Sequence, residues 1–66
     1  MRSALKSARQ RAGYSQQRLA ILVGVTQQTV SKHERGRLTP EHFKTIREYE
    51  RALRTPAAVL FPDVFK

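Results

Sequence analysis

Helix-start and helix-stop residues divide this sequence into short segments, and this division constrains its fold more than any other feature. Gly13, Gly24 and Gly36 each follow a segment in which apolar residues recur at helical spacing. Ser15 and Thr26 lie where the second and third segments begin, and both residue types favour the N-cap position of a helix. The first part of the chain therefore predicts three short helices, over about 3–12, 15–24 and 26–35.

The second part of the chain predicts two more helices. The pairs Thr39–Pro40 and Thr55–Pro56 each place a capping residue before a proline at the first helical position, and the helices would run to about Arg54 and Leu60. The inner face of the longer helix is expected to carry Phe43, Ile46, Tyr49, Ala52 and Leu53. A β-hairpin is the alternative here, but residues 41–54 are rich in helix formers and lack strand alternation. The sequence thus predicts one all-α domain of five helices over residues 1–66.

Charge is distributed unevenly along the chain. Thirteen Lys and Arg residues against five Asp and Glu residues give a net charge of +8. Residues 1–39 hold eight basic residues and one acidic residue, whereas residues 40–66 hold five and four, so the two parts carry +7 and +1. The N-terminal part is suited to meet a polyanion such as nucleic acid. A membrane surface as the partner, or an ordinary basic surface without such a partner, is the alternative.

Several functional classes are disfavoured by composition. There is no cysteine, and two histidines, His33 and His42, are too few for a convincing metal site, so we expect no metal and no cofactor. The sequence contains no nucleophile–base set of the kind that enzymes use, so an enzyme is disfavoured. We also expect no small-molecule ligand. No apolar run is long enough to span a membrane, and the N-terminus lacks the apolar core of a signal peptide, so we expect a cytoplasmic protein.

Residues 16–35 have the spacing of two helices that cross steeply over a tight turn. Such a helix-turn-helix requires a small residue where the helices approach, and Ala20 supplies it. The turn requires a residue that tolerates a left-handed backbone, and Gly24 lies four residues later. Val25 and Val30 are placed to point back at the first of the two helices.

The sequence GVTQQTVSKHERG, residues 24–36, resembles the reading helix of lambdoid repressors that use paired glutamines. Nearly the whole chain resembles the XRE family, the helix-turn-helix family of phage Cro and lysogenic repressor proteins, and LRTPAAVLF resembles its short closing helix. The resemblance implies a compact five-helix, lambda-repressor-like DNA-binding domain with the helix-turn-helix at the second and third helices. It also implies a bacterial cell or a phage-infected host.

Paired glutamines begin the third helix, the part that enters the major groove in this motif. Gln27 and Gln28 can each offer a donor and an acceptor to adenine, or a donor to guanine. Ser31 and Lys32 lie one turn further and are also expected to face bases. An ordinary solvent-facing role is the alternative for all four.

Phosphate contacts are expected at helix starts and after the third helix. The resemblance implies them for Gln16 and Thr26, and Gln17 shares the same helix start, where backbone N–H groups favour phosphate. Thr26 also fits a plain capping role. Arg35, Arg37 and Lys44 follow the reading helix and are candidates to hold the flanking backbone, with mobile surface charge as the alternative.

Two charged or titratable residues of the third helix are assigned to structure. Glu34 is the sole acid of the first 39 residues, and the resemblance implies a partly buried ion pair between it and Arg9 of the first helix. His33 stands where the family places a tryptophan, leucine or isoleucine, and it is expected to be a half-buried core residue with one ring nitrogen paired.

The C-terminal segment carries more apolar surface than a short tail can hide. Leu60 is expected to complete the core, and the rest predicts a weak homodimer, tightened by DNA, through Ala57, Ala58 and Phe61. The alternative is that Phe61 and Phe65 fold onto their own core.

The sequence as a whole predicts a Cro-type transcriptional repressor that binds a palindromic double-stranded DNA operator as a dimer. An antitoxin that also represses its own operon and a restriction-modification controller are the alternatives. The folded motif and the mixed charge of the fourth helix argue against a third, a cationic membrane-surface peptide.

Overall fold

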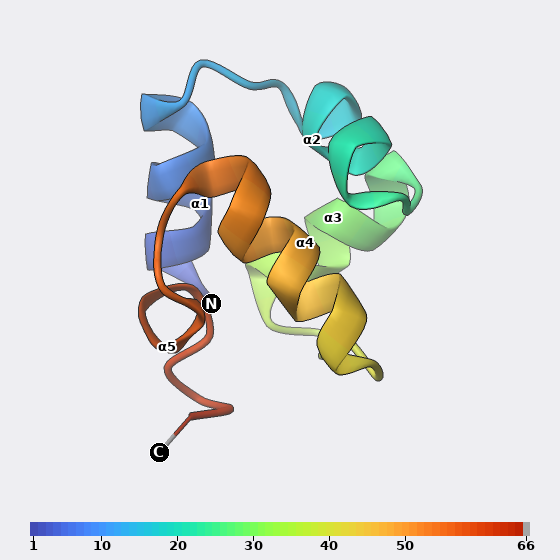
Figure 1. Cartoon of the computed structure of the whole chain (residues 1–66). Helices are drawn as coiled ribbons and strands as arrows, with labels where there is room; N and C mark the ends of the chain where they lie inside the picture. The colour runs from blue at the N-terminus through green and yellow to red at the C-terminus, as the bar shows by residue number, and fades with distance from the viewer. Residues whose placement is uncertain (66) are drawn as a thin grey trace.

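The computed structural model describes residues 1–65, and this part of the chain folds into five α-helices without a strand (Figure 1). The predicted all-α architecture is confirmed. In chain order the helices are α1 (Ser3–Arg11), α2 (Gln16–Val23), α3 (Gln27–Arg35), α4 (Phe43–Leu53) and α5 (Ala57–Leu60).

Side-chain caps and left-handed glycines bound α2 and α3, as the sequence predicts. The hydroxyl of Ser15 accepts a hydrogen bond from the backbone N–H of Arg18 at 3.0 Å, which satisfies a donor that the first turn of α2 leaves unpaired. The hydroxyl of Thr26 does the same for Thr29 at 3.1 Å. Gly24 ends α2 with a φ of 86°, a conformation that other residues adopt at a cost.

Helix α4 begins later than predicted. The sequence places its start at Pro40, whereas the structure starts it at Phe43 with His42 at the N-cap position. Thr39 does not cap the helix, and its hydroxyl instead accepts a hydrogen bond from Arg2 at 2.7 Å. Phe43 is therefore the first residue of α4. It is 69% exposed and lies against Phe65 rather than on the inner face.

Helix α5 is capped by a side chain of α4 and not by Thr55. The backbone N–H of Ala57 donates to the carboxylate of Glu50 at 2.7 Å. The Thr55 hydroxyl turns back to the carbonyl of Leu53 instead, and Pro56 occupies the N-cap position.

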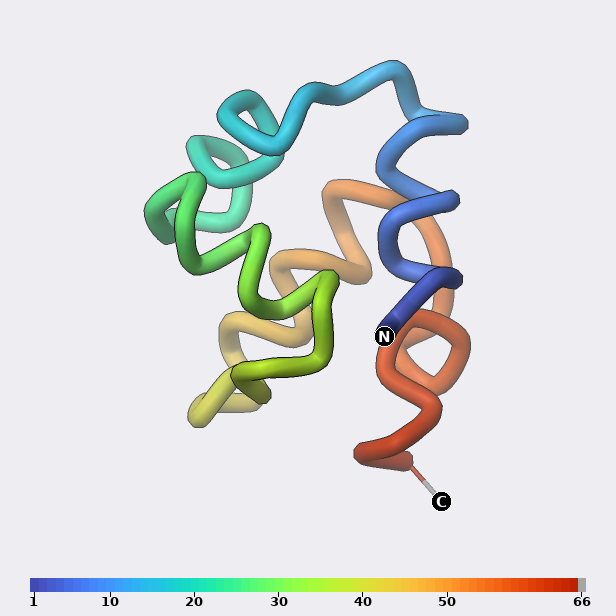
Figure 2. Tube along the Cα trace, turned by 180° about the vertical axis from the view of Figure 1, so that it is seen from behind, coloured from blue at the N-terminus to red at the C-terminus, as the bar shows by residue number. Residues whose placement is uncertain are grey.

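A single apolar core receives side chains from every helix. Tyr49 is fully buried, and its ring meets that of Phe61, which follows α5, edge to face with the ring centroids 5.4 Å apart. Helix α2 packs against α3 and α4, and α5 packs against α1 and α4. The start of α1 lies beside the segment after α5 in both views (Figures 1 and 2). The buried apolar residues are Leu5, Ala8, Leu19, Ala20, Val23, Val30, Ile46, Tyr49, Leu53, Leu60 and Phe61.

Candidate nucleic-acid interface

Helices α2 and α3 form a helix-turn-helix, and they lie side by side in Figures 1 and 2. Ala20 is buried where the two helices approach, and its carbonyl accepts the backbone N–H groups of both Gly24 and Val25, at 2.8 and 3.0 Å. Val30 of α3 is fully buried, and Val25 packs against the core. The turn is thus held from both ends, which fixes the direction in which α3 leaves it.

The first turn of α3 presents two adjacent amide side chains to solvent. Gln27 and Gln28 are both exposed, and neither side chain makes a hydrogen bond to another residue within 1–65. Their donors and acceptors therefore remain open to an external partner. One helical turn further along α3, Lys32 is exposed and Ser31 is half-buried. The four predicted base-reading residues therefore differ in solvent exposure.

The residues predicted to contact phosphate at helix starts differ in exposure and in how many of their hydrogen-bonding groups are already paired within the protein. Gln17 is exposed, whereas Gln16 is half-buried and donates from Nε2 to Glu34 Oε1 at 3.1 Å. That bond leaves Gln16 one amide N–H and its backbone N–H in the first turn of α2. Thr26 caps α3 and also exchanges a hydrogen bond with the hydroxyl of Thr29 at 2.9 Å.

Exposed basic side chains flank the C-terminal end of α3. Arg35 and Arg37 lie on either side of Gly36, and Lys44 is in the first turn of α4. All three are exposed. The backbone between them is ordered, since the N–H of Arg37 donates to the carbonyl of Lys32 at 3.0 Å.

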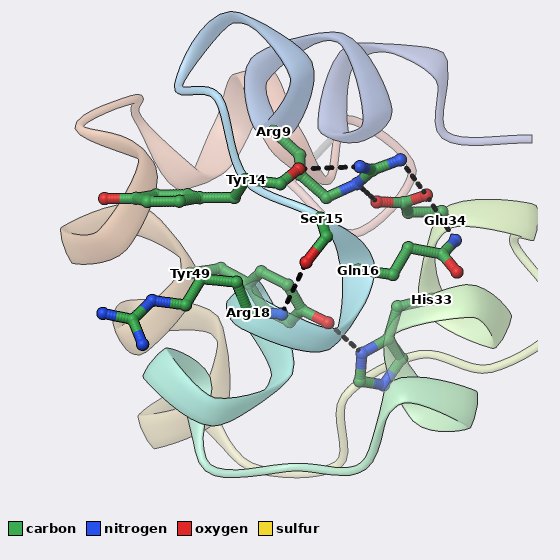
Figure 3. Close-up of polar contacts among 8 residues, drawn as sticks. All are labelled: Arg9, Tyr14, Ser15, Gln16, Arg18, His33, Glu34 and Tyr49. Carbon is green, nitrogen blue, oxygen red and sulfur yellow. Dashed lines mark hydrogen bonds and ion pairs between the residues drawn. The ribbon is translucent and has the colours of Figure 1, made fainter.

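Arg9 and Glu34 form the expected ion pair between α1 and α3 (Figure 3). Arg9 Nε lies 2.6 Å from Glu34 Oε2, and Nη2 lies 3.4 Å from Oε1. Glu34 is 2% exposed, and Gln16 supplies a third donor to its carboxylate. A further bond from Arg9 Nη1 to the carbonyl of Tyr14 fixes the linker that leads to α2. The pair therefore orients α1, α2 and α3 relative to one another.

His33 is fully buried rather than half-buried. Its Nδ1 lies 2.7 Å from the hydroxyl of Tyr49, and the two rings meet edge to face (Figure 3). Burial, and secondarily the charge of Arg2, lowers the pKa of His33 from its usual 6.5 to about 4. Burial, and secondarily the charge of Glu34, raises the pKa of Tyr49 above its usual range. Both side chains are thus neutral at pH 7.

Phe61 is not available as a predicted dimer contact. It is fully buried, against Tyr49 on one side and beneath the guanidinium of Arg2 at 5.1 Å on the other. Leu60 is fully buried as expected. Of the remaining predicted interface residues, Ala58 is exposed and Ala57 is half-buried.

Arg2 is a structural residue that the sequence did not reveal. It is 5% exposed and pairs with Asp63 at 2.8 Å, across almost the whole length of the chain. An arginine just before a helix gives no sign of this burial, and the one available signal is that Asp63 stands alone as an acid in an apolar tail.

Comparison with known proteins identifies the family. A profile of the helix-turn-helix domain matches residues 1–60. The chain belongs to the XRE-like helix-turn-helix family. A protein of Bacillus subtilis (strain 168) named "Uncharacterized HTH-type transcriptional regulator YgzD" is 48% identical to the chain over 40 residues. That similarity spans 61% of this chain and 61% of the relative. No solved structure matches.

Two further observations bear on this family member. Within residues 1–65, no helix has the length and apolar character needed to cross a bilayer. The same residues contain no cluster of three or more His, Cys, Asp or Glu side chains that would hold a metal ion.

Proposed function

We propose that the chain is a sequence-specific DNA-binding transcriptional repressor of the Cro type. The observation that carries the proposal is the pair of exposed amides, Gln27 and Gln28, on the first turn of α3. They have no partner within the described chain, and they follow a turn that is fixed by Gly24 and by buried contacts of Ala20.

In this proposal α3 lies in the major groove with its N-terminal turn against the bases. An amide that is free on both its oxygen and its nitrogen can pair with N6 and N7 of adenine, and each such pair discriminates by about 1–3 kcal/mol. Gln17, Thr26 and the remaining N–H groups of Gln16 face the phosphates at the starts of α2 and α3. Arg35, Arg37 and Lys44 contact the backbone beyond the other end of α3.

We further propose a two-fold dimer on a palindromic operator with half-site centres about 34–36 Å apart. One module of this size buries too little DNA surface for tight binding alone. The dimer contact is assigned to Ala57 and Ala58, extended by the exposed apolar side chains Val59 and Val64. These residues lie in the part of the chain with a net charge of +1, where two copies approach with little repulsion.

The decisive experiment separates base reading from phosphate binding. An operator is first selected from a random duplex library, and affinities are then measured on the operator and on a duplex of unrelated sequence. Gln27→Ala and Gln28→Ala are expected to weaken operator binding by about 1–3 kcal/mol, to spare the unrelated duplex and to relax the preference at one base pair.

The matched control is Arg37→Ala, which removes an exposed side chain next to the same helix. It is expected to weaken binding to both duplexes and to lower the salt slope by about one. Equal losses on both duplexes for the glutamine variants would exclude base reading by these residues. Failure of the library to yield a preferred sequence would exclude sequence-specific binding.

A further inference from the structure

The guanidinium of Arg2 has all five of its N–H groups in hydrogen bonds. Nε and Nη2 donate to the two carboxylate oxygens of Asp63, at 3.0 and 2.8 Å. Nη1 donates to the carbonyls of His33 and Leu38, at 2.7 and 2.8 Å. The second N–H of Nη2 donates to the Thr39 hydroxyl at 2.7 Å. Arg2 is 5% exposed and its guanidinium is fully paired, an arrangement that restricts the side chain to this geometry.

Arg2 fastens the C-terminal end of α3. Its guanidinium caps the carbonyl of His33, and its backbone N–H caps the carbonyl of Glu34 at 2.8 Å. Carbonyls of the last turn have no partner within a helix, and a cation is favoured beside them. The bonds to Leu38 and Thr39 fix the segment that follows. Residues 35–37, which carry the two exposed arginines, thus lie between contacts of Arg2 on both sides, in addition to the backbone bonds from Gly36 to His33 and from Arg37 to Lys32.

The tail after α5 holds Arg2 in place from the other side. Arg2 Cζ lies 5.1 Å from the centroid of the Phe61 ring, and both carboxylate oxygens of Asp63 accept hydrogen bonds from the guanidinium. Figures 1 and 2 show the start of the chain against this tail. The Asp63 side chain is 51% exposed, so it can be replaced without opening the core.

We propose that Arg2 and Asp63 form a clamp through which the tail, residues 61–63, positions the C-terminal end of α3 and residues 35–39 for contact with the DNA backbone. Arg2 is a positioning residue and Asp63 acts through it. Loss of the Asp63 carboxylate removes the acceptors of two donors at the solvent-facing side of Arg2, which favours the outward rotation of Arg2 into water. Outward rotation also removes the Arg2 donor from the carbonyl of Leu38 and leaves the carbonyl of His33 with the backbone N–H of Gly36 as its donor. The DNA part of this inference rests on the proposed function, whereas the coupling of tail to α3 does not.

Electrostatics and the clamp predict opposite effects for the loss of Asp63. Removal of one of five acids raises the net charge from 13 − 5 = +8 to 13 − 4 = +9, which by itself tightens binding to DNA. The clamp predicts weaker binding, because the backbone that carries Arg35 and Arg37 loses the support of Arg2 on both sides. The sign of the change therefore distinguishes the two.

The test compares Asp63→Ala with Glu41→Ala in the full chain. Glu41 is an exposed acid, so its removal makes the same change in net charge. Amide hydrogen exchange is measured first, without DNA. In Asp63→Ala, exchange is expected to accelerate at residues 35–39 and to stay unchanged in α2, whose amides report on global unfolding. Glu41→Ala should leave both regions unchanged.

The second measurement is the affinity for a short duplex of mixed sequence over a range of salt concentrations. Asp63→Ala is expected to bind about three- to tenfold more weakly, with a salt slope lower by about one, because one phosphate contact is lost. Glu41→Ala is expected to bind as well as the parent chain or more tightly. If Asp63→Ala matches Glu41→Ala in both measurements, the clamp is overturned. If the parent chain shows no salt-dependent binding, the proposed function fails, and hydrogen exchange still decides whether the clamp exists.

Discussion

Nδ1 of His33 and the hydroxyl oxygen of Tyr49 lie 2.7 Å apart in the core, and this hydrogen bond ties α3 to α4. His33 is 2% exposed and Tyr49 is fully buried. Burial lowers the pKa of His33, and the charge of Arg2 lowers it further by opposing a second positive charge at this place. Where the resemblance implies an apolar residue, this chain has a neutral, hydrogen-bonded imidazole whose protonation the fold resists.

The folded protein should lose stability as the pH falls from about 6.5 to about 4. His33 in the unfolded chain takes up a proton below pH 6.5, whereas in the folded protein it does so only near pH 4. Between these values the unfolded state binds more protons, so the free energy of unfolding decreases as the pH is lowered. This group contributes up to about 3 kcal/mol of the decrease. Urea unfolding at pH 7, 6, 5 and 4 measures the slope.

His42 provides the control for this titration, because it is the second of two histidines and is exposed. His33→Gln retains a polar partner for Tyr49 but cannot titrate, so its stability should vary less between pH 6.5 and 4. His42→Gln should keep the slope of the parent chain. An unchanged slope in His33→Gln would assign the acid sensitivity to the carboxylates.

Breaking the Arg9–Glu34 pair from one side should destabilise the fold strongly. Arg9→Met leaves the buried carboxylate of Glu34 with Gln16 as its remaining donor, at a cost of about 3–5 kcal/mol. The double variant Arg9→Met/Glu34→Leu removes the stranded charge and should recover most of that loss. Urea unfolding of the two single variants and the double variant gives the coupling energy. A double variant no more stable than Arg9→Met would show that packing, and not the stranded charge, dominates.

Replacing Arg54 with glycine should stabilise the C-terminal end of α4. It closes α4 in the left-handed conformation, with φ at 50°, and it is exposed. A side chain in this conformation costs about 1–2 kcal/mol, and glycine avoids that cost. Arg54→Gly should therefore raise the free energy of unfolding by up to about 1 kcal/mol. Arg54→Ala keeps the strain and is the control, so an equal gain in both variants would trace the effect to charge.

The elements that the sequence predicted well are those set by neighbouring residues. Ser15 and Thr26 act on backbone groups three residues away, and Gly24 and Gly36 adopt the backbone conformation that glycine favours. These interactions need no knowledge of the rest of the fold. They fixed four helix boundaries, and with them the helix-turn-helix that places Gln27 outward.

The elements that the sequence missed depend on residues far apart in the chain. Thr39 has the local signature of a cap, but its hydroxyl pairs with Arg2, 37 positions away, and α4 starts later with His42 at the N-cap position. Phe61 has the signature of an exposed tail residue, but Tyr49 and Arg2 enclose it. A chain of this size has few large apolar side chains, and it therefore draws distant ones into one core.

Substitutions at Phe61 and Ala58 should have different effects, although the two residues are only three positions apart. The first should affect folding and the second association. Phe61 is fully buried, so Phe61→Ala leaves a cavity beside Tyr49 and should lower the free energy of unfolding by about 3–5 kcal/mol. That loss is a large part of the stability expected for a domain of this length. Urea unfolding at a protein concentration too low for association measures it.

Ala58 is exposed on α5, so Ala58→Lys should leave the folded monomer intact. At a two-fold contact the new lysine meets its own copy or lies close to it, and the like charges oppose association. Sedimentation should then show a weaker dimer, and binding to the selected operator should weaken even though the added positive charge favours DNA. Tighter operator binding together with unchanged sedimentation would place the dimer contact elsewhere on the molecule.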